Sequence, residues 1–173
     1  MEKLYLTLLL LAEGVIAGGS KQQTNCLCAQ GLCDDGWVQY LNACYKPIME
    51  RVLWPDAEAK CLTHESHLAS IHSSEENEFV FNLMGRPLNH NAGKAYWIGG
   101  HDTFQEGTHM WTDGTKMTFL QFGFGQPDNP GNEHYIGSWY IENGTITWND
   151  YPRHITFPFI CKYYLGNRLC SNP

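Results

Sequence analysis

Alternating apolar and polar residues mark both ends of the chain as β-structure. The segment GWVQYLNACYKPI, residues 36–48, alternates in this way and predicts two strands joined by a turn near Asn42. Two further segments, TITWND at 145–150 and FPFICKYY at 157–164, predict the strands that close the fold. The short apolar run AYWIGG, at 95–100, is typical of a buried strand.

Two segments in the first half of the chain have features of helices instead. In WPDAEAKC, residues 54–61, Pro55 stands where a first helical turn accepts proline. In SIHSSEENEFVFNLMG, Ser73 precedes Glu76 by three residues, which is the capping-box spacing. Gly85 is placed to end this second helix. We therefore expect two helices between the first pair of strands and the central buried strand.

Turn-forming residues dominate the middle of the chain. Asp113-Gly114, in MWTDGTKM, is a hairpin turn signal. The region from about Gln121 to Gly144 is rich in glycine and proline and predicts a long loop, which is uncommon unless the loop is functional or disordered. Early helices, an irregular middle and strands at both ends together predict an α+β fold.

The first residues predict export from the cell. A short basic start, the apolar run LYLTLLLLA and the small residues of VIAGGS are the three parts of a signal peptide. The apolar run is shorter than the ~20 residues that span a bilayer. We assign residues 1–18 to this signal peptide, with cleavage near Ala17 to Ser20 and secretion of the protein. A retained anchor is the alternative, and no other segment is expected to enter a membrane.

Composition narrows the function classes. The formal charge is −7 and no basic cluster occurs, which argues against nucleic acid binding. Aromatic residues make up 13% of the chain, enough to build a folded core. The sequence has neither a nucleophile elbow nor an HExxH motif, so we expect no enzymatic activity. The eight histidines show no metal-ligand spacing.

The cysteines follow the predicted signal peptide, so they meet an oxidising compartment and disulfides are expected. Their number is odd, which leaves at least one without an intramolecular partner. Their spacing does not fit a zinc site, because no CxxC or HxxxH pattern is present. The seven are Cys26, Cys28, Cys33, Cys44, Cys61, Cys161 and Cys170.

Side-chain oxygen donors gather in GQPDNPGNEHYIGSW, at 125–139, and in WND, at 148–150. Calcium takes six to eight oxygen ligands, so these donors could form an open shell completed by water or by vicinal sugar hydroxyls. Pro127 permits a cis bond between two of the donors. The alternative is an ordinary turn-rich loop, because Asp, Asn, Gly and Pro are also the common turn formers. The donors are Gln126, Asp128, Glu133, Asn149 and Asp150.

Taken in order, these motifs resemble those of the C-type lectin-like domain over about Cys33 to Tyr164. The matching segments are CDDGWVQYLNACY, WPDAEAKC, LASIHSSEEN, WIGG, QPDN, WND and FICKY. The chain looks closest to small secreted lectins of fish and marine invertebrates. The resemblance implies two helices, two small antiparallel sheets and a long calcium- and sugar-binding loop. The domain at 33–164 would follow an N-terminal extension at 19–32 and precede a tail at 165–173.

In that family the QPD loop, a later Glu and the WND tripeptide hold the sugar-binding calcium ion, and QPD accompanies galactose-type sugars. The resemblance therefore implies calcium-dependent binding of galactose-containing glycans, in defence or in mucosal recognition of microbes. The alternative is a C-type lectin-like protein with an ice-binding, mineral-matrix or protein-binding role. Carried over, the residues that hold both calcium and sugar are Gln126, Asp128, Glu133, Asn149 and Asp150.

The resemblance also implies two disulfides, Cys33–Cys44 and Cys61–Cys161. Among Cys26, Cys28 and Cys170, one bridge to the N-terminal segment would leave a cysteine for a disulfide-linked homodimer. A free or locally paired thiol is the alternative. Asn143 begins an N-glycosylation sequon.

This sequence departs from the family pattern in several places. Tyr135 and Arg153 stand where the family usually has a disulfide that pins the long loop, and the gap from Gln126 to Glu133 is one residue short. Pro130 stands where galactose binders often place an aromatic ring against the sugar. The candidate substitutes are Tyr135, Trp139, Tyr140 and His134, although we expect Trp139 and Trp148 to pack in the core.

An acidic pair, Asp102 and Glu106 in HDTFQEG, matches a further calcium site of some relatives. Its other positions here hold Asn129 and His134, which are weaker calcium ligands than the usual acids. We therefore expect weak calcium occupancy at this second position.

Overall fold

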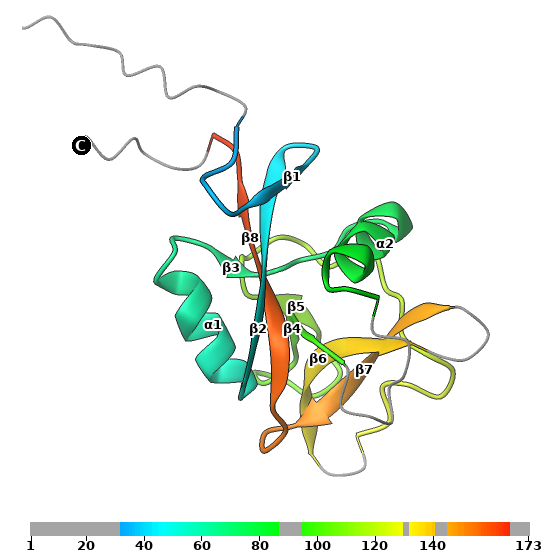
Figure 1. The fold of residues 1–173 in the computed structure, drawn as a ribbon. Helices are drawn as coiled ribbons and strands as arrows, with labels where there is room; N and C mark the ends of the chain where they lie inside the picture. The colour runs from blue at the N-terminus through cyan, green and yellow to red at the C-terminus, as the bar shows by residue number, and fades with distance from the viewer. Residues whose placement is uncertain (1–31, 87–94, 130–131, 141–144, 167–173) are drawn as a thin grey trace, which may run out of the picture.

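The computed structural model describes residues 32–86, 95–129, 132–140 and 145–166, apart from the side chains of Trp139 and Tyr140. These ranges contain two helices and eight strands (Figure 1). In chain order they are β1 (Val38–Tyr40), β2 (Ala43–Val52), α1 (Trp54–Leu62), β3 (His67–Leu68), α2 (Ser74–Leu83), β4 (Trp97–His101), β5 (Met110–Trp111), β6 (Glu133–Tyr140), β7 (Ile146–Pro152) and β8 (Phe157–Tyr164).

Both predicted helices are present, with the predicted ends. Pro55 lies in the first turn of α1. The Ser73 side chain caps α2 by accepting a hydrogen bond of 3.1 Å from the backbone N–H of Glu76. Gly85, at φ +82°, follows α2 in the left-handed conformation that glycine adopts without strain. The α+β class is thus confirmed, and Figure 1 shows the two helices on opposite sides of the long β2–β8 pair.

The strands form two antiparallel groups that meet at a single parallel pair. In the first group β2 pairs with β1 and β8, and β3 pairs with β8. In the second group β4 pairs with β5 and β6, and β6 pairs with β7. The pairing of Trp97 with Phe159 joins β4 to β8 and makes the whole one eight-stranded sheet. The two small sheets implied by the family resemblance are therefore continuous.

The expectation of an irregular region from Gln121 to Gly144 is wrong in part, because β6 lies inside it. This strand is paired on both sides, by β4 and by β7. Its Gly137 weakens the strand signal in the sequence, but the packing requires it. A Cβ at this position would lie 3.0 Å from the Tyr151 ring and 3.1 Å from the Tyr96 carbonyl oxygen.

The hairpin expected at Asp113-Gly114 is also wrong, although a turn does form there. Asp113 Oδ1 accepts the backbone N–H of Thr115 at 2.9 Å, a local bond that competes with strand pairing. The segment after the turn forms no named strand, and β5 pairs back onto β4 instead.

Two disulfides tie the described elements together. Cys33 bonds to Cys44 at the N-terminal hairpin. Cys61 of α1 bonds to Cys161 of β8 across 100 residues of sequence, and closing a loop of this length contributes about 4.7 kcal/mol in the chain-entropy estimate. Both pairs are those implied by the family resemblance.

A buried ion pair fixes α2 to the sheet. Lys162 Nζ lies 2.6 Å from Glu76 Oε1 and donates to the carbonyl oxygen of Ser70 at 2.8 Å. The Tyr45 hydroxyl donates to the same Glu76 oxygen, and burial with the neighbouring carboxylate raises the pKa of Tyr45. Because these groups satisfy one another, they form a structural network and not a reactive one.

Candidate metal centres

The five predicted ligands come from two parts of the fold that β6 and β7 bring together. Gln126 and Asp128 precede β6, and Glu133 is its first residue. Asn149 and Asp150 lie in β7, which pairs antiparallel with β6. Carboxylate oxygens of Asp128, Glu133 and Asp150 lie within 4.8 Å of one another. The structure thus gathers three acids that the sequence separates by up to twenty-two residues.

Three buried oxygens of the predicted ligand set lack partners. Gln126 Oε1, Asn149 Oδ1 and Asp150 Oδ1 are buried, and none accepts a hydrogen bond from the described residues. A buried acceptor without a partner typically costs about 1–3 kcal/mol. An ion with a preference for oxygen ligands would satisfy all three, and calcium accepts carboxylate and amide oxygens together. The donor set therefore fits calcium.

Hydrogen bonds hold the loop of this cluster in position. The Gln126 N–H donates to the Gly123 carbonyl at 3.0 Å, and the Gln126–Pro127 bond is cis. Further along, Asn129 Oδ1 accepts the backbone N–H of Glu133 at 2.6 Å. This bond ties the loop to the start of β6 and positions Glu133.

Crowded carboxylates make the cluster electrostatically unfavourable on its own. Burial, with the charges of Asp150 and Asp128, raises the pKa of Glu133 to about 7. Burial also raises the pKa of Asp150, although backbone N–H groups around Asp128 and Asn129 partly offset the shift. Like charges at short range disfavour ionisation, so the folded loop favours a proton or a cation at this place.

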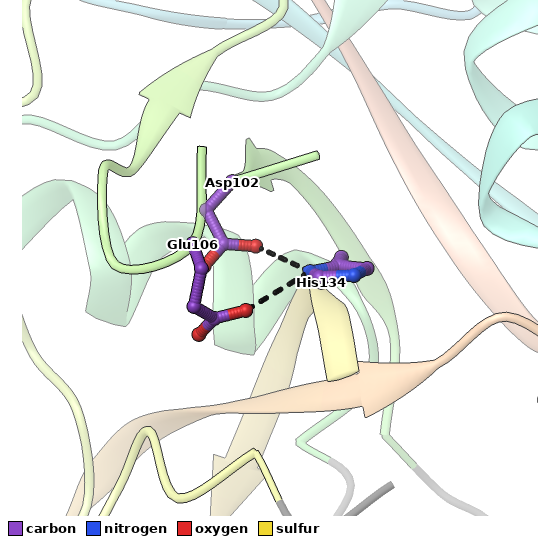
Figure 2. Close-up of side chains that lie close together, drawn as sticks. All are labelled: Asp102, Glu106 and His134. Atoms are coloured by element: carbon purple, nitrogen blue, oxygen red, sulfur yellow. Dashed lines mark hydrogen bonds and ion pairs between the residues drawn. The ribbon is translucent and has the colours of Figure 1, made fainter. Parts of the chain in front are cut away.

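A second cluster lies where β4 ends, beside the start of β6. Figure 2 shows the carboxylates of Asp102 and Glu106 pointing toward the His134 ring. His134 Nδ1 is 2.9 Å from Asp102 Oδ1 and 3.5 Å from Glu106 Oε2. His109 Nε2 lies 3.8 Å from the other Asp102 oxygen. The family resemblance already places His134 with Asp102 and Glu106. The contact of His109 with Asp102 has no signal in the sequence, because the turn from Asp102 to His109 creates it.

Several positions singled out in the sequence have other roles. The Tyr135 ring stacks on Trp54 at 4.8 Å, which places it in packing and not against a sugar. Trp148 is fully buried and donates to Asn77 Oδ1 at 3.0 Å, so its predicted core position is confirmed. Arg153 is exposed. The predicted signal peptide and the positions Cys26, Cys28, Pro130, Asn143 and Cys170 lie outside the described residues.

One exposed aromatic residue near the first cluster was not singled out in the sequence. Phe124 is fully exposed and lies within the turn closed by Gly123 and Gln126. Its signal is its placement between two glycines directly before QPD.

The fold and its motif residues define a lectin-type domain, and the chain belongs to the Lectin C-type domain family, which matches residues 50–163. Among its relatives it is 35% identical over 162 residues to a lectin from Pleurodeles waltl, with 92% of this chain and 91% of that protein covered. It is 32% identical over 157 residues to lactose-binding lectin l-2 from Anguilla japonica, with 88% and 85% covered.

Solved structures that share this fold belong to proteins named for different functions. The C-type lectin CEL-I from Cucumaria echinata superposes with a TM-score of 0.68 at 32% identity, covering 77% of this chain and 98% of that one. Herring type II antifreeze protein superposes with a TM-score of 0.67 at 30% identity, covering 77% and 99%. The same fold therefore occurs in a protein named as a lectin and in one named as an antifreeze protein.

Among the residues that the structure describes, no helix is both long and apolar enough to cross a membrane.

Proposed function

We propose that this protein is a secreted lectin that binds galactose-type glycans through a calcium ion in its long loop. The observation that carries the proposal is the set of buried, unpartnered oxygens beside three crowded carboxylates. Hydrogen bonding within the described chain leaves these atoms unsatisfied, and a cation satisfies them. The proposed residues for both calcium and sugar are Gln126, Asp128, Glu133, Asn149 and Asp150.

When bound, calcium supplies open coordination positions for two neighbouring sugar hydroxyls. The chain's own groups orient that sugar. The carboxylates of Asp128 and Glu133 accept hydrogen bonds from hydroxyls, while the amide NH₂ groups of Gln126 and Asn149 donate to them. Because donors and acceptors alternate around the ion, the site can distinguish sugars by the arrangement of their hydroxyls.

Two observations support a galactose-type preference. The loop carries Gln before and Asp after Pro127, the order that the family resemblance associates with galactose. One relative, at 32% identity, is named as a lactose-binding lectin. Exchanging the two residues in a Gln126→Glu, Asp128→Asn variant reverses the donor and acceptor pattern. We expect this variant to be retained by immobilised mannose and to lose retention on lactose.

Phe124 is our candidate for the aromatic surface that the sugar packs against. Tyr135 is occupied by its contact with Trp54, and the His134 ring faces two carboxylates. Phe124 is fully exposed two residues before Gln126. Galactose has an apolar face, and an exposed ring beside the ion can cover it.

A column of immobilised lactose tests the function directly. We expect the full-length protein to be retained with calcium and to elute with a chelator or with free galactose. Asp128→Asn should abolish retention, whereas Asp56→Asn, an exposed acid on α1, should leave it unchanged. Retention that does not depend on calcium, or no retention at all, would rule out this site as the sugar-binding site.

Ice binding is the second candidate function, because an antifreeze protein at 30% identity shares the fold. Thermal hysteresis of the purified protein distinguishes it from sugar binding. A freezing-point depression that survives the Asp128→Asn change would favour ice binding over the calcium lectin.

The remaining proposals concern the segments outside the described residues. We propose that residues 1–18 direct secretion and that Asn143 carries a glycan. We also propose that the proteolytically matured chain forms a disulfide-linked homodimer through its N-terminal or C-terminal cysteines. A dimer band on a non-reducing gel that disappears on reduction supports the linkage, and a monomer in both lanes contradicts it. A mass shift on treatment with an N-glycosidase tests the glycan.

A further inference from the structure

The second cluster has a composition that calcium does not prefer. We propose that Asp102, Glu106 and His134 form a site for a divalent transition metal of the zinc class. This proposal is independent of the sugar-binding function, because it uses none of the five residues assigned to calcium and sugar.

Donor chemistry is the first argument. Calcium binds through oxygen, and a site with an imidazole nitrogen among its few donors is poor for it. Zinc binds imidazole nitrogen and carboxylate oxygen together, and a mixed set of this kind suits it better than it suits calcium. His134 stands at the position where the resemblance to calcium-binding relatives would place an acid. This one replacement changes the class of metal that the cluster favours.

The distances within the cluster also suit a small ion. Ligand atoms at ~2.0–2.1 Å from a tetrahedral zinc ion lie roughly 3.3 Å apart. His134 Nδ1 lies 2.9 Å from Asp102 Oδ1 and 3.5 Å from Glu106 Oε2. Small side-chain movements are therefore enough for all three atoms to face one ion, which would replace the hydrogen between the nitrogen and the carboxylates.

The central ligand is already held in position. Asp102 is only 2% exposed, and its Oδ2 accepts the Gly107 N–H at 2.8 Å. Its own N–H donates to the His134 carbonyl at 3.2 Å, so the two ligands are joined through the backbone as well. Outer hydrogen bonds of this kind orient a ligand and reduce the cost of assembling a site.

An ion can reach the site from solvent, and a fourth ligand is available there. Glu106 is 55% exposed and His134 is 23% exposed, so an ion can enter from solvent. His109 Nε2 lies 3.8 Å from Asp102 Oδ2 on the other side of that carboxylate. His109 is not one of the residues whose ligand atoms lie within 4.8 Å of one another, and a water molecule can take the fourth position.

Zinc titration of the full-length protein by calorimetry, with calcium present in excess, tests the proposal. We expect one zinc ion to bind at this site, and the His134→Gln and Glu106→Gln variants to bind it at least about ten-fold more weakly. His154→Gln, which changes an exposed histidine outside the cluster, is the matched control and should bind as the parent does. Melting temperatures without metal establish that each variant is folded.

Cobalt provides a readout that depends on ligand type. Co²⁺ in a site with nitrogen and oxygen ligands of low coordination number gives visible absorption bands, and we expect these bands in the parent and in Asp128→Asn but not in His134→Gln. The cysteines are identical in all the variants, so thiol binding would appear equally in each. Zinc affinity and cobalt bands that are unchanged in both His134→Gln and Glu106→Gln would overturn the proposal and leave only a hydrogen bond between His134 and Asp102.

Discussion

The two clusters differ in how their charges are satisfied. In the first, built around Asp128, Glu133 and Asp150, three carboxylates lie close together and three buried oxygens of the ligand set have no partner among the described residues. In the second, an imidazole lies between two carboxylates and pairs with both. The first cluster is costly without a cation. A metal at the second cluster must instead replace the contacts that the His134 ring makes with the two carboxylates.

One strand serves both clusters. Glu133 of the first cluster and His134 of the second are consecutive residues at the start of β6, where the pairing with β7 is irregular between Glu133 and Tyr135. A single strand can therefore present an oxygen donor to one ion and a nitrogen donor to another. The composition of each cluster, and not its place in the fold, decides which metal it suits.

Calcium should stabilise the protein strongly through the first cluster alone. At a hundred-fold excess over its Kd, an ion that binds only the folded state contributes about 2.7 kcal/mol. For a chain of this size that corresponds to a rise in Tm of roughly 5–10 °C. Differential scanning calorimetry with calcium and with a chelator measures the rise.

Two variants test whether the stabilisation by calcium comes from the first cluster alone. Asp128→Asn should lose most of the calcium-dependent rise in Tm, and Glu106→Gln should retain it. An equal loss in both variants would mean that calcium occupies the second cluster as well.

The pH dependence of the calcium-free protein should also come from the first cluster. The pKa of Glu133 is raised from 4.5 to about 7 on folding, so the folded state holds this proton more tightly than the unfolded state. The resulting stabilisation is complete below pH 4.5 and is lost as the pH rises through 7. We therefore expect the Tm in chelator to fall between pH 5 and pH 8, and to fall less in Glu133→Gln.

Saturating calcium should reduce this fall, because the ion stabilises the ionised carboxylate. Glu106→Gln is the matched control and should keep the dependence of the parent. A fall of the same size in Glu133→Gln would assign the dependence to other groups.

The smallest effect concerns two exposed phenylalanines, one beside each cluster. Phe124 is fully exposed before QPD, and Phe104 is 81% exposed in the turn of the second cluster. If an aromatic contact contributes ~0.5–1.5 kcal/mol, Phe124→Ala should weaken lactose binding about two- to ten-fold. Phe104→Ala should leave it unchanged. Isothermal titration with lactose distinguishes the two, and equal effects would contradict a specific role for Phe124.

Much of the fold could be predicted because local signals agree with the final packing. Pro55, Ser73 and Gly85 mark helix ends by rules that act within a few residues. The β6 strand was missed because its glycine and its neighbours resemble a loop. Only the presence of β4 and β7 on both sides makes Gly137 a necessary part of a strand.

In the candidate sites too, residue types could be predicted from the sequence, whereas some contacts could not. The oxygen donors of the QPD and WND segments were recognisable as a set, since their residue types match a known pattern. The grouping of His134 with Asp102 and Glu106 was also implied by the family resemblance. The contact of His109 with Asp102 was not, because it depends on where a turn places the two side chains. The positioning bond from Glu133 to Asn129 is equally invisible in the sequence.

The Cys61–Cys161 bond has a topological consequence for the chain between its ends. It joins positions that are 100 apart in the sequence, so the described parts of the long loop belong to one covalent ring. A protease that cuts the ring once releases no fragment, because both pieces stay joined at α1 and β8. A clipped molecule would keep its mass on a non-reducing gel, and only reduction would reveal the cut. A single cut in the loop therefore leaves α1 and β8 covalently joined.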